Sequence, residues 1–151
     1  MIRLVFTLCA AALVGFGHTH AYLAASVPAQ DSVVSEEHAP AFISLEFTEG
    51  IELPFSTFKL VRVQHDLNVT ADTFALRLNA LVAPQAVPLL DTRDDVEGQQ
   101  QVTIQPASGT VAQLELHLLQ PLTPGSYMLV WRALSADSHI VEGYLVFTVV
   151  Q

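Results

Sequence analysis

Three residues near the two ends of the chain have the types and the spacing of a metal site. Asp137 and His139 are separated by one residue, and another histidine, His20, stands close to the N-terminus. In an extended segment, residues i and i+2 project to the same side with Cα atoms roughly 6.5 Å apart, so both side chains can reach one ion. The pair therefore suggests metal binding, although Asp and Ser in a polar connection also commonly cap a turn.

His20 gains two donor groups if the chain is cut immediately before it. Residues 1–19 have the features of a cleaved secretion signal. Arg3 gives a basic start, and the apolar run from Leu4 to Phe16 is shorter than the ~20 residues of a membrane-spanning helix. A free N-terminal histidine chelates a metal through its α-amine and ring Nδ1, and the metal must displace the proton of the amine. A cut after Ala21 fits the pattern about as well and would remove His20.

Charge and cysteine content restrict the partners of the chain. It has 15 acidic and 6 basic side chains, a formal net charge of −9, which becomes −10 once Arg3 is removed. This balance argues against nucleic acid or an anionic membrane surface as a partner. The only cysteine, Cys9, lies in the predicted signal, so the predicted mature chain has no disulfide and no thiolate ligand. The remaining donors suit Cu(II) or Zn(II) better than Cu(I).

An alternation with a period of two dominates the chain and predicts an all-β fold. Apolar and polar residues alternate over 43–48, 114–118 and 127–132, which is typical of half-buried strands. Further β-like stretches cover 57–63, 74–81, 101–104 and 143–149, with Pro and Gly turn signals between the strands. Short strands between such turns predict one domain, an immunoglobulin-like β-sandwich or Greek-key barrel of about seven strands.

Two segments refine this prediction. Leu122 to Tyr127 has the spacing of a tyrosine corner, in which a tyrosine at a strand start hydrogen-bonds back to the preceding loop. Residues 82–101 are rich in Pro, Asp and Gln and are predicted to form a long surface loop. The acids of this loop lack the regular spacing of a calcium loop and are interpreted as a solvated charge run.

Four segments of the chain match, in order, the pattern of a known family. They are His20-Ala21-Tyr22-Leu23 with Ser26-Val27-Pro28-Ala29 shortly after, Leu45 to Gly50, Leu122 to Tyr127 running to Trp131, and Ser135 to His139 followed by Glu142-Gly143. With these segments the chain resembles the CopC family of periplasmic copper-resistance proteins. The middle, roughly 64–109, does not match closely and is longer than usual. The resemblance implies a single copper-binding domain over residues 20–151.

The resemblance further implies one Cu(II) ion as the cofactor and a set of ligands for it. His20 would give its amine and imidazole, His139 a second imidazole and Asp137 a carboxylate, while Glu49 matches an acid that the family places near this site. Glu49 also shares the strand parity of Phe47, which would turn it inward or toward a rim. An unpaired carboxylate is costly there, and a nearby cation would relieve that cost.

The function implied by the resemblance is a periplasmic, non-catalytic protein that buffers or delivers copper in copper homeostasis or resistance. Met128 would be the only methionine after signal removal, so the methionine-rich Cu(I) segment of some members is not expected. We expect a monomer without membrane insertion of the mature chain. A membrane copper transporter that acts with it would be a separate protein.

Two other functions remain open at this point. An N-terminal histidine with a second histidine also forms the histidine brace of copper monooxygenases. Two features argue against such an enzyme. Asp137 would occupy an equatorial position at the copper that oxygen needs, and the aromatic residues form no extended platform for a polysaccharide. A metal-free immunoglobulin-like interaction module is the other alternative. It is favoured if the mature chain begins at Tyr22, because both nitrogen ligands of His20 would then be lost.

Overall fold

The all-β sandwich expected from the sequence is confirmed in a computed structural model, which describes residues 21–93 and 95–151. The predicted signal, His20 and Asp94 lie outside these residues. The described part contains one strand more than the seven expected. The elements are β1 (Leu23–Val27), β2 (Ser32–Ser35), the 3-10 helix η1 (Glu36–His38), β3 (Phe42–Val63), α1 (Phe74–Asp91), β4 (Gln99–Gln100), β5 (Val102–Gln105), β6 (Thr110–Leu118), β7 (Gly125–Ser135) and β8 (Ile140–Val150).

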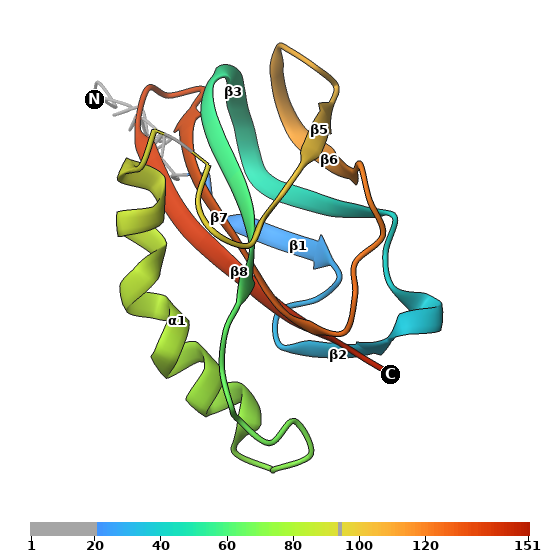
Figure 1. Ribbon diagram of the computed structural model, residues 1–151. Coiled ribbons are helices and arrows are strands. Elements are labelled where there is room, and N and C mark those ends of the chain that lie inside the picture. Colours follow the sequence, from blue (N-terminus) through green and yellow to red (C-terminus); the bar gives the residue numbers. More distant parts are fainter. Residues whose placement is uncertain (1–20, 94) are drawn as a thin grey trace, which may run out of the picture.

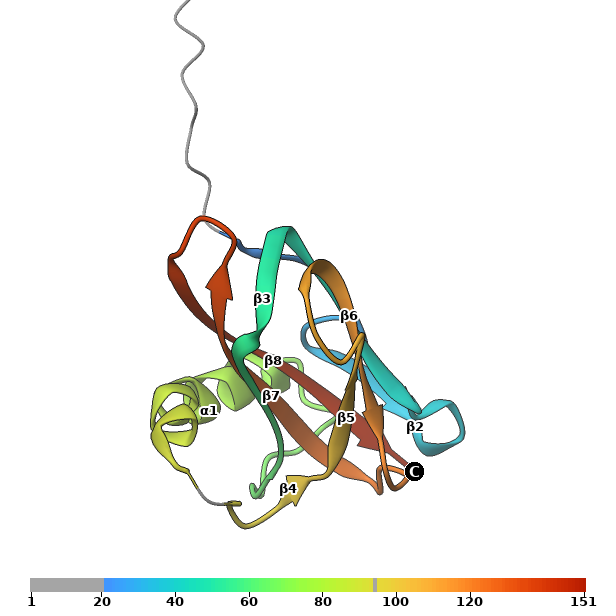
Figure 2. The same ribbon diagram turned by 90° about the horizontal axis from the view of Figure 1, so that it is seen from above.

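The strands form a sheet that curls around one core, as Figure 1 shows and Figure 2 shows from above. Their order is β2-β8-β7-β3-β6-β5, and β1 and β4 also pair with β3. The first half of β3 pairs with β1 and β6, whereas its second half pairs with β7. The register shifts between Glu52 and Thr57, around Pro54, where the strand passes from one set of neighbours to the other. This long strand therefore belongs to both layers of the sandwich.

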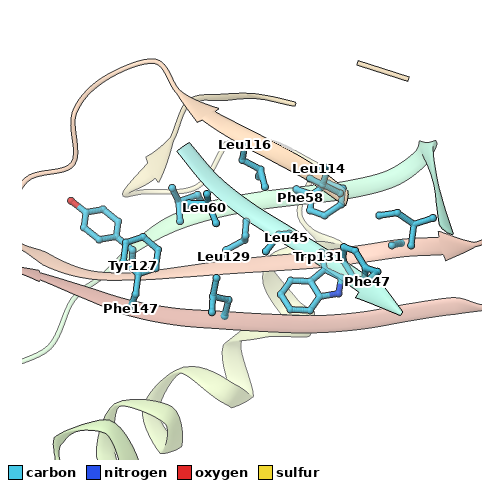
Figure 3. Packing of buried hydrophobic residues seen from close by; sticks show 14 of the residues in the cluster. Leu45, Phe47, Phe58, Leu60, Leu114, Leu116, Tyr127, Leu129, Trp131 and Phe147 are labelled. Carbon is cyan, nitrogen blue, oxygen red and sulfur yellow. The ribbon is translucent and has the colours of Figure 1, made fainter. Parts of the chain in front are cut away.

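The core lies inside the curled sheet and is built by the alternating apolar residues (Figure 3). In the first half of β3 the odd-numbered apolar side chains from Ile43 to Leu53 point into the core, and after Pro54 the even-numbered Phe58 and Leu60 do so. They meet buried side chains of β6, β7 and β8. Tyr127 stacks on Phe147 with ring centroids 5.6 Å apart. Its hydroxyl donates to the Thr123 carbonyl at 2.7 Å, which confirms the predicted tyrosine corner.

The predicted strand over 74–81 is wrong, and so is the predicted loop over 82–91, because both segments belong to helix α1. The apolar residues here follow one another too closely to separate a strand from a helix by periodicity. Pro84 and Pro88 favoured a loop because proline removes a helical hydrogen bond. Both prolines lie on the exposed side of α1, where water can satisfy the freed carbonyls. Beyond the helix, residues 99–100 and 102–105 form the short strands β4 and β5.

Helix α1 covers the outer face of β7 and β8. Its buried residues recur every four positions and form a second apolar cluster with one face of these strands. Strand β7 is therefore buried on both faces, and the half-buried strand expected from its alternation is wrong for that reason. The cluster comprises Phe74, Leu78, Val82, Ala86 and Leu90 of the helix with Met128, Val130 and Val146 of the sheet.

A buried lysine fixes the C-terminal end of α1 to the sheet. Lys59 of β3 is only 8% exposed. Its Nζ donates to the carbonyl oxygens of Leu89 at 3.0 Å and Thr92 at 2.6 Å, and to the Thr92 hydroxyl at 2.8 Å. These carbonyls lack partners within the helix, and a cation also complements the negative end of the helix dipole. Of the helices in residues 21–93 and 95–151, none combines the length and apolarity needed to span a bilayer.

Candidate metal centre

The connection between β7 and β8 brings Asp137 and His139 together. The Ser135 amide donates to the His139 carbonyl at 2.8 Å, and the Ser138 amide donates to the Ser135 carbonyl at 2.8 Å. Ser138 adopts a left-handed conformation with φ of 71°. The segment is thus a tight turn and not the extended stretch on which the spacing argument relied. The two side chains nevertheless meet, with His139 Nδ1 2.9 Å from Asp137 Oδ2.

A buried serine orients the Asp137 carboxylate. Ser135 is 1% exposed, and its hydroxyl donates to Asp137 Oδ1, which also accepts from the His139 amide at 3.3 Å. The Ser135 hydroxyl is the main cause that lowers the pKa of Asp137 from 3.8 to about 2; desolvation opposes it, and His139 adds to the lowering through its ring, amide and charge. The carboxylate is therefore ionised throughout the physiological pH range.

Two further segments converge on this turn. The Ala136 amide donates to the Gly50 carbonyl at 2.8 Å, which joins the turn to β3. The Tyr22 amide donates to Thr48 Oγ1 at 2.9 Å, and the Thr48 amide donates to the Tyr22 carbonyl at 2.8 Å. Glu49 stands between these two attachment points and is half-buried. The described chain thus begins beside the segment that carries Glu49, which in turn is bonded to the turn of Asp137 and His139.

The separation of the Asp137 and His139 donors fits a shared metal ion. Nitrogen and oxygen ligands of Zn(II) lie about 2.0–2.1 Å from the metal, and two such ligands at a right angle are ~2.9 Å apart. Cu(II) favours square-planar or tetragonal N and O ligands, which have this right-angle relation. The observed distance is 2.9 Å. Within residues 21–93 and 95–151, no group of three or more His, Cys, Asp or Glu side chains is arranged to hold a metal.

An open pocket of about 520 Å³ adjoins the turn. Trp131, His139 and Glu142 line it together with the segment around Tyr22. Glu142 Oε1 accepts a hydrogen bond from Arg132 Nε at 2.5 Å, and this bond holds the Glu142 carboxylate at the pocket wall. The only tryptophan of the chain therefore lies in the same pocket as a candidate ligand, and its fluorescence can report on metal binding.

Sequence reasoning gave no role to Ser135, although it holds Asp137 in place. The available signal was a Ser-x-Asp spacing at the start of a polar turn, where short hydroxyl and carboxylate side chains commonly bond to each other or to the backbone. It also gave no role to His38, His65 or His117. The ring of His117 lies 2.8 Å from Glu115 Oε2 on β6, in an acid-x-His pair of the same spacing as Asp137 and His139.

Comparisons with known proteins agree on one family. The CopC domain model matches residues 66–150. Copper resistance protein C of Escherichia coli is 31% identical over 130 residues, which cover 86% of this chain and 81% of the relative. Copper resistance protein C of Pseudomonas syringae pv. tomato is 31% identical over 133 residues, which cover 86% of this chain and 80% of the relative. Both relatives therefore align with most of the chain.

Two solved structures share the fold. PcoC, a methionine-rich copper resistance protein from Escherichia coli, superposes with a TM-score of 0.57 and 25% identity over 87% of this chain and 99% of its own. CopC from Methylosinus trichosporium OB3b superposes with a TM-score of 0.53 and 23% identity, and the match covers 87% of this chain and 94% of that structure. In contrast to a methionine-rich protein, this chain has two methionines, of which Met128 is 1% exposed.

Proposed function

The chain belongs to the CopC family, and we propose that it binds one Cu(II) ion in the periplasm and buffers or delivers it without catalysis. Its relatives are named copper resistance proteins, which supports a copper-related function. The proposed ligands are the amine and imidazole of His20, the imidazole of His139 and the carboxylate of Asp137. Glu49 is proposed as an additional acid at the site.

The observation that carries this proposal is the 2.9 Å separation of Asp137 Oδ2 and His139 Nδ1. A metal ion could bind both atoms while the two side chains keep nearly their present positions. The carboxylate of Asp137 is ionised at neutral pH, so it needs no deprotonation before it binds a cation. The two ligands are thus preorganised by the turn.

The attachment of Tyr22 to Thr48 supports the part assigned to His20. Residue 20 precedes Tyr22 by two positions, and Tyr22 is bonded to the residue next to Glu49. Two residues span at most about 7 Å, so the proposed N-terminal ligands start within reach of this end of the sandwich. A histidine at the mature N-terminus would then add two nitrogen donors to the pair on the turn.

The donor set determines how copper would be released. Nitrogen and oxygen donors favour Cu(II) over Cu(I), which prefers thiolate and thioether ligands. Reduction should therefore loosen the ion and favour its transfer to a separate partner such as a membrane copper transporter. Acidification should also release it, because protons compete with the metal for the amine and imidazole nitrogens.

A copper titration of the processed protein, followed by Trp131 fluorescence, tests the assignment. His139→Ala should weaken Cu(II) binding by more than ~100-fold, since loss of even an outer-shell partner commonly costs 10–100-fold. His117→Ala is the matched control, because it removes an imidazole from the equally spaced pair with Glu115. Near-equal affinities for the two variants would reject the proposed site.

The N-terminal ligands are tested separately. Acetylation of the His20 α-amine keeps the imidazole but removes the amine as a donor, which opens the chelate. We expect this modification to weaken Cu(II) binding strongly while leaving the thermal stability of the apo protein unchanged. An acetylated protein that binds copper as tightly as the processed chain would exclude the amine as a ligand.

A further inference from the structure

The outward face of α1 is apolar for most of its length. The exposed fractions of Leu76, Leu81 and Val87 are 73%, 40% and 45%. The other exposed residues of the helix are Arg77, Ala80, Ala83, Pro84, Gln85, Pro88 and Asp91, of which four are apolar. Both views place α1 on the outside of the molecule, with β7 and β8 on one side only (Figures 1 and 2). The solvent side of a surface helix is normally polar or charged, whereas seven of the ten exposed residues of α1 are apolar, so this face is expected to have a partner.

The charges on this helix argue against a lipid surface as the partner. Interfacial helices carry a polar face rich in Lys and Arg that meets anionic headgroups. Helix α1 has one cation, Arg77, and one anion, Asp91. The chain as a whole has a formal charge of −9, which would repel an anionic membrane. A protein surface is therefore the better fit.

The two charged residues are placed symmetrically about Pro84, seven positions away on either side. Each is therefore ~10.5 Å from Pro84 along the helix axis, and their directions around the axis differ by about 40°. In the described residues, no carboxylate lies within ion-pair distance of Arg77. Asp91 forms an ion pair within its own chain, with its Oδ1 2.9 Å from Arg132 Nη2.

We propose that α1 packs against α1 of a second copy of this chain, antiparallel and with the two-fold axis near Pro84. This arrangement places Arg77 of each copy opposite Asp91 of the other. It also brings Leu81 of one helix to the level of Val87 of the other. Such an isologous contact needs a surface that is complementary to itself, and the exposed residues of α1 provide one.

The dimer is weak. The helix has 18 residues, so its face is about 27 Å long and ~10 Å wide. Even when the extra surface of protruding side chains is added, this area is below the ~800 Å² that each partner buries in a standard interface. We therefore expect a dissociation constant in the micromolar range or above. This differs from the monomer expected from the sequence, because the strand and loop predicted over 74–101 did not reveal a helical face.

Sedimentation equilibrium of the copper-free processed protein tests the proposal, and it does so independently of copper binding. Between roughly 10 μM and roughly 1 mM the average mass should rise from one chain toward two. Val87→Glu should raise the dimer dissociation constant by at least ~10-fold, because a charge would be buried in the contact. Val33→Glu on β2 is the matched control, since Val33 is 48% exposed and Val87 is 45% exposed. It should leave self-association unchanged.

A charge exchange tests the antiparallel register. Arg77→Glu alone and Asp91→Arg alone should each self-associate less than the unchanged protein, because like charges then face each other. An equimolar mixture of the two variants should associate again, since both ion pairs are restored in the mixed dimer. Circular dichroism checks that each variant keeps its helix. A wild-type protein that stays monomeric over this range overturns the proposal, whether or not it binds anionic vesicles, and so does a mixture that fails to associate.

Discussion

Gly143→Ala should destabilise the sandwich next to the candidate metal centre. Gly143 pairs with Trp131 across β7 and β8. A Cβ at Gly143 would lie 2.7 Å from Trp131 Cε2 and closer still to Cζ2, whereas ordinary contacts start at 3.4 Å. The indole would have to retreat by at least 0.7 Å, but it is 5% exposed and packs edge-on against Phe47 with centroids 6.0 Å apart. Overpacking of this kind costs about 1–3 kcal/mol.

Urea denaturation followed by far-UV circular dichroism measures this cost as a lower midpoint with an unchanged slope. Trp131→Phe removes the ring atoms that meet the new Cβ, so the double variant should lose less stability than the sum of the two single variants. The expected coupling is about 0.5–3 kcal/mol. A Gly143→Ala protein as stable as the wild type, or strictly additive variants, would refute the steric argument.

Three further predictions concern hydrogen bonds that the structure shows. Lys59→Met should lower the free energy of unfolding by about 2–3 kcal/mol in urea denaturation, because the C-terminal carbonyls of α1 lose a charged donor; unchanged stability would contradict the capping role. Tyr127→Phe should cost about 0.5–1.5 kcal/mol by the same assay, because it removes the hydrogen bond from the Tyr127 hydroxyl to the Thr123 carbonyl. Ser135→Ala should raise the pKa of Asp137 from about 2 toward 3.8, measured by NMR titration. Since the pKa of Asp137 is lower in the folded state, the stabilisation from its ionised form is present above about pH 4 and lost as the pH falls toward 2. The Ser135→Ala variant should keep only the smaller part of this stabilisation that comes from His139, and an unshifted pKa of Asp137 would contradict the role of the serine.

Most of the sandwich could be predicted from the sequence because one face of each strand is buried. The alternation around Leu45, Leu116 and Leu129 identified core strands, and the turn before Tyr127 identified the tyrosine corner. Helix α1 could not be predicted in this way. Its apolar residues occur on the buried and the exposed sides alike, so they carry no clear period, and its two prolines are permitted only because they lie on the solvent side.

The candidate site was predictable where the ligands are close in sequence. Asp137 and His139 meet because one short turn holds both, whereas the spacing alone could not show that Ser135 would orient the acid. The position of Glu49 beside this turn depends on the pairing of β3 with β7, which here joins Ile51 to Ser135, 84 positions away in the sequence. Such long-range pairing is not visible in local sequence patterns. The assignment of His20 remains a prediction.

Intact-mass spectrometry of the exported protein, without metal and with one equivalent of Cu(II), tests the central claim most directly. It reads the N-terminal residue and the metal stoichiometry in one experiment. We predict a chain that begins at His20 and carries one copper ion. A chain that begins at Tyr22, or one that takes up no copper, would contradict the proposed Cu(II) site.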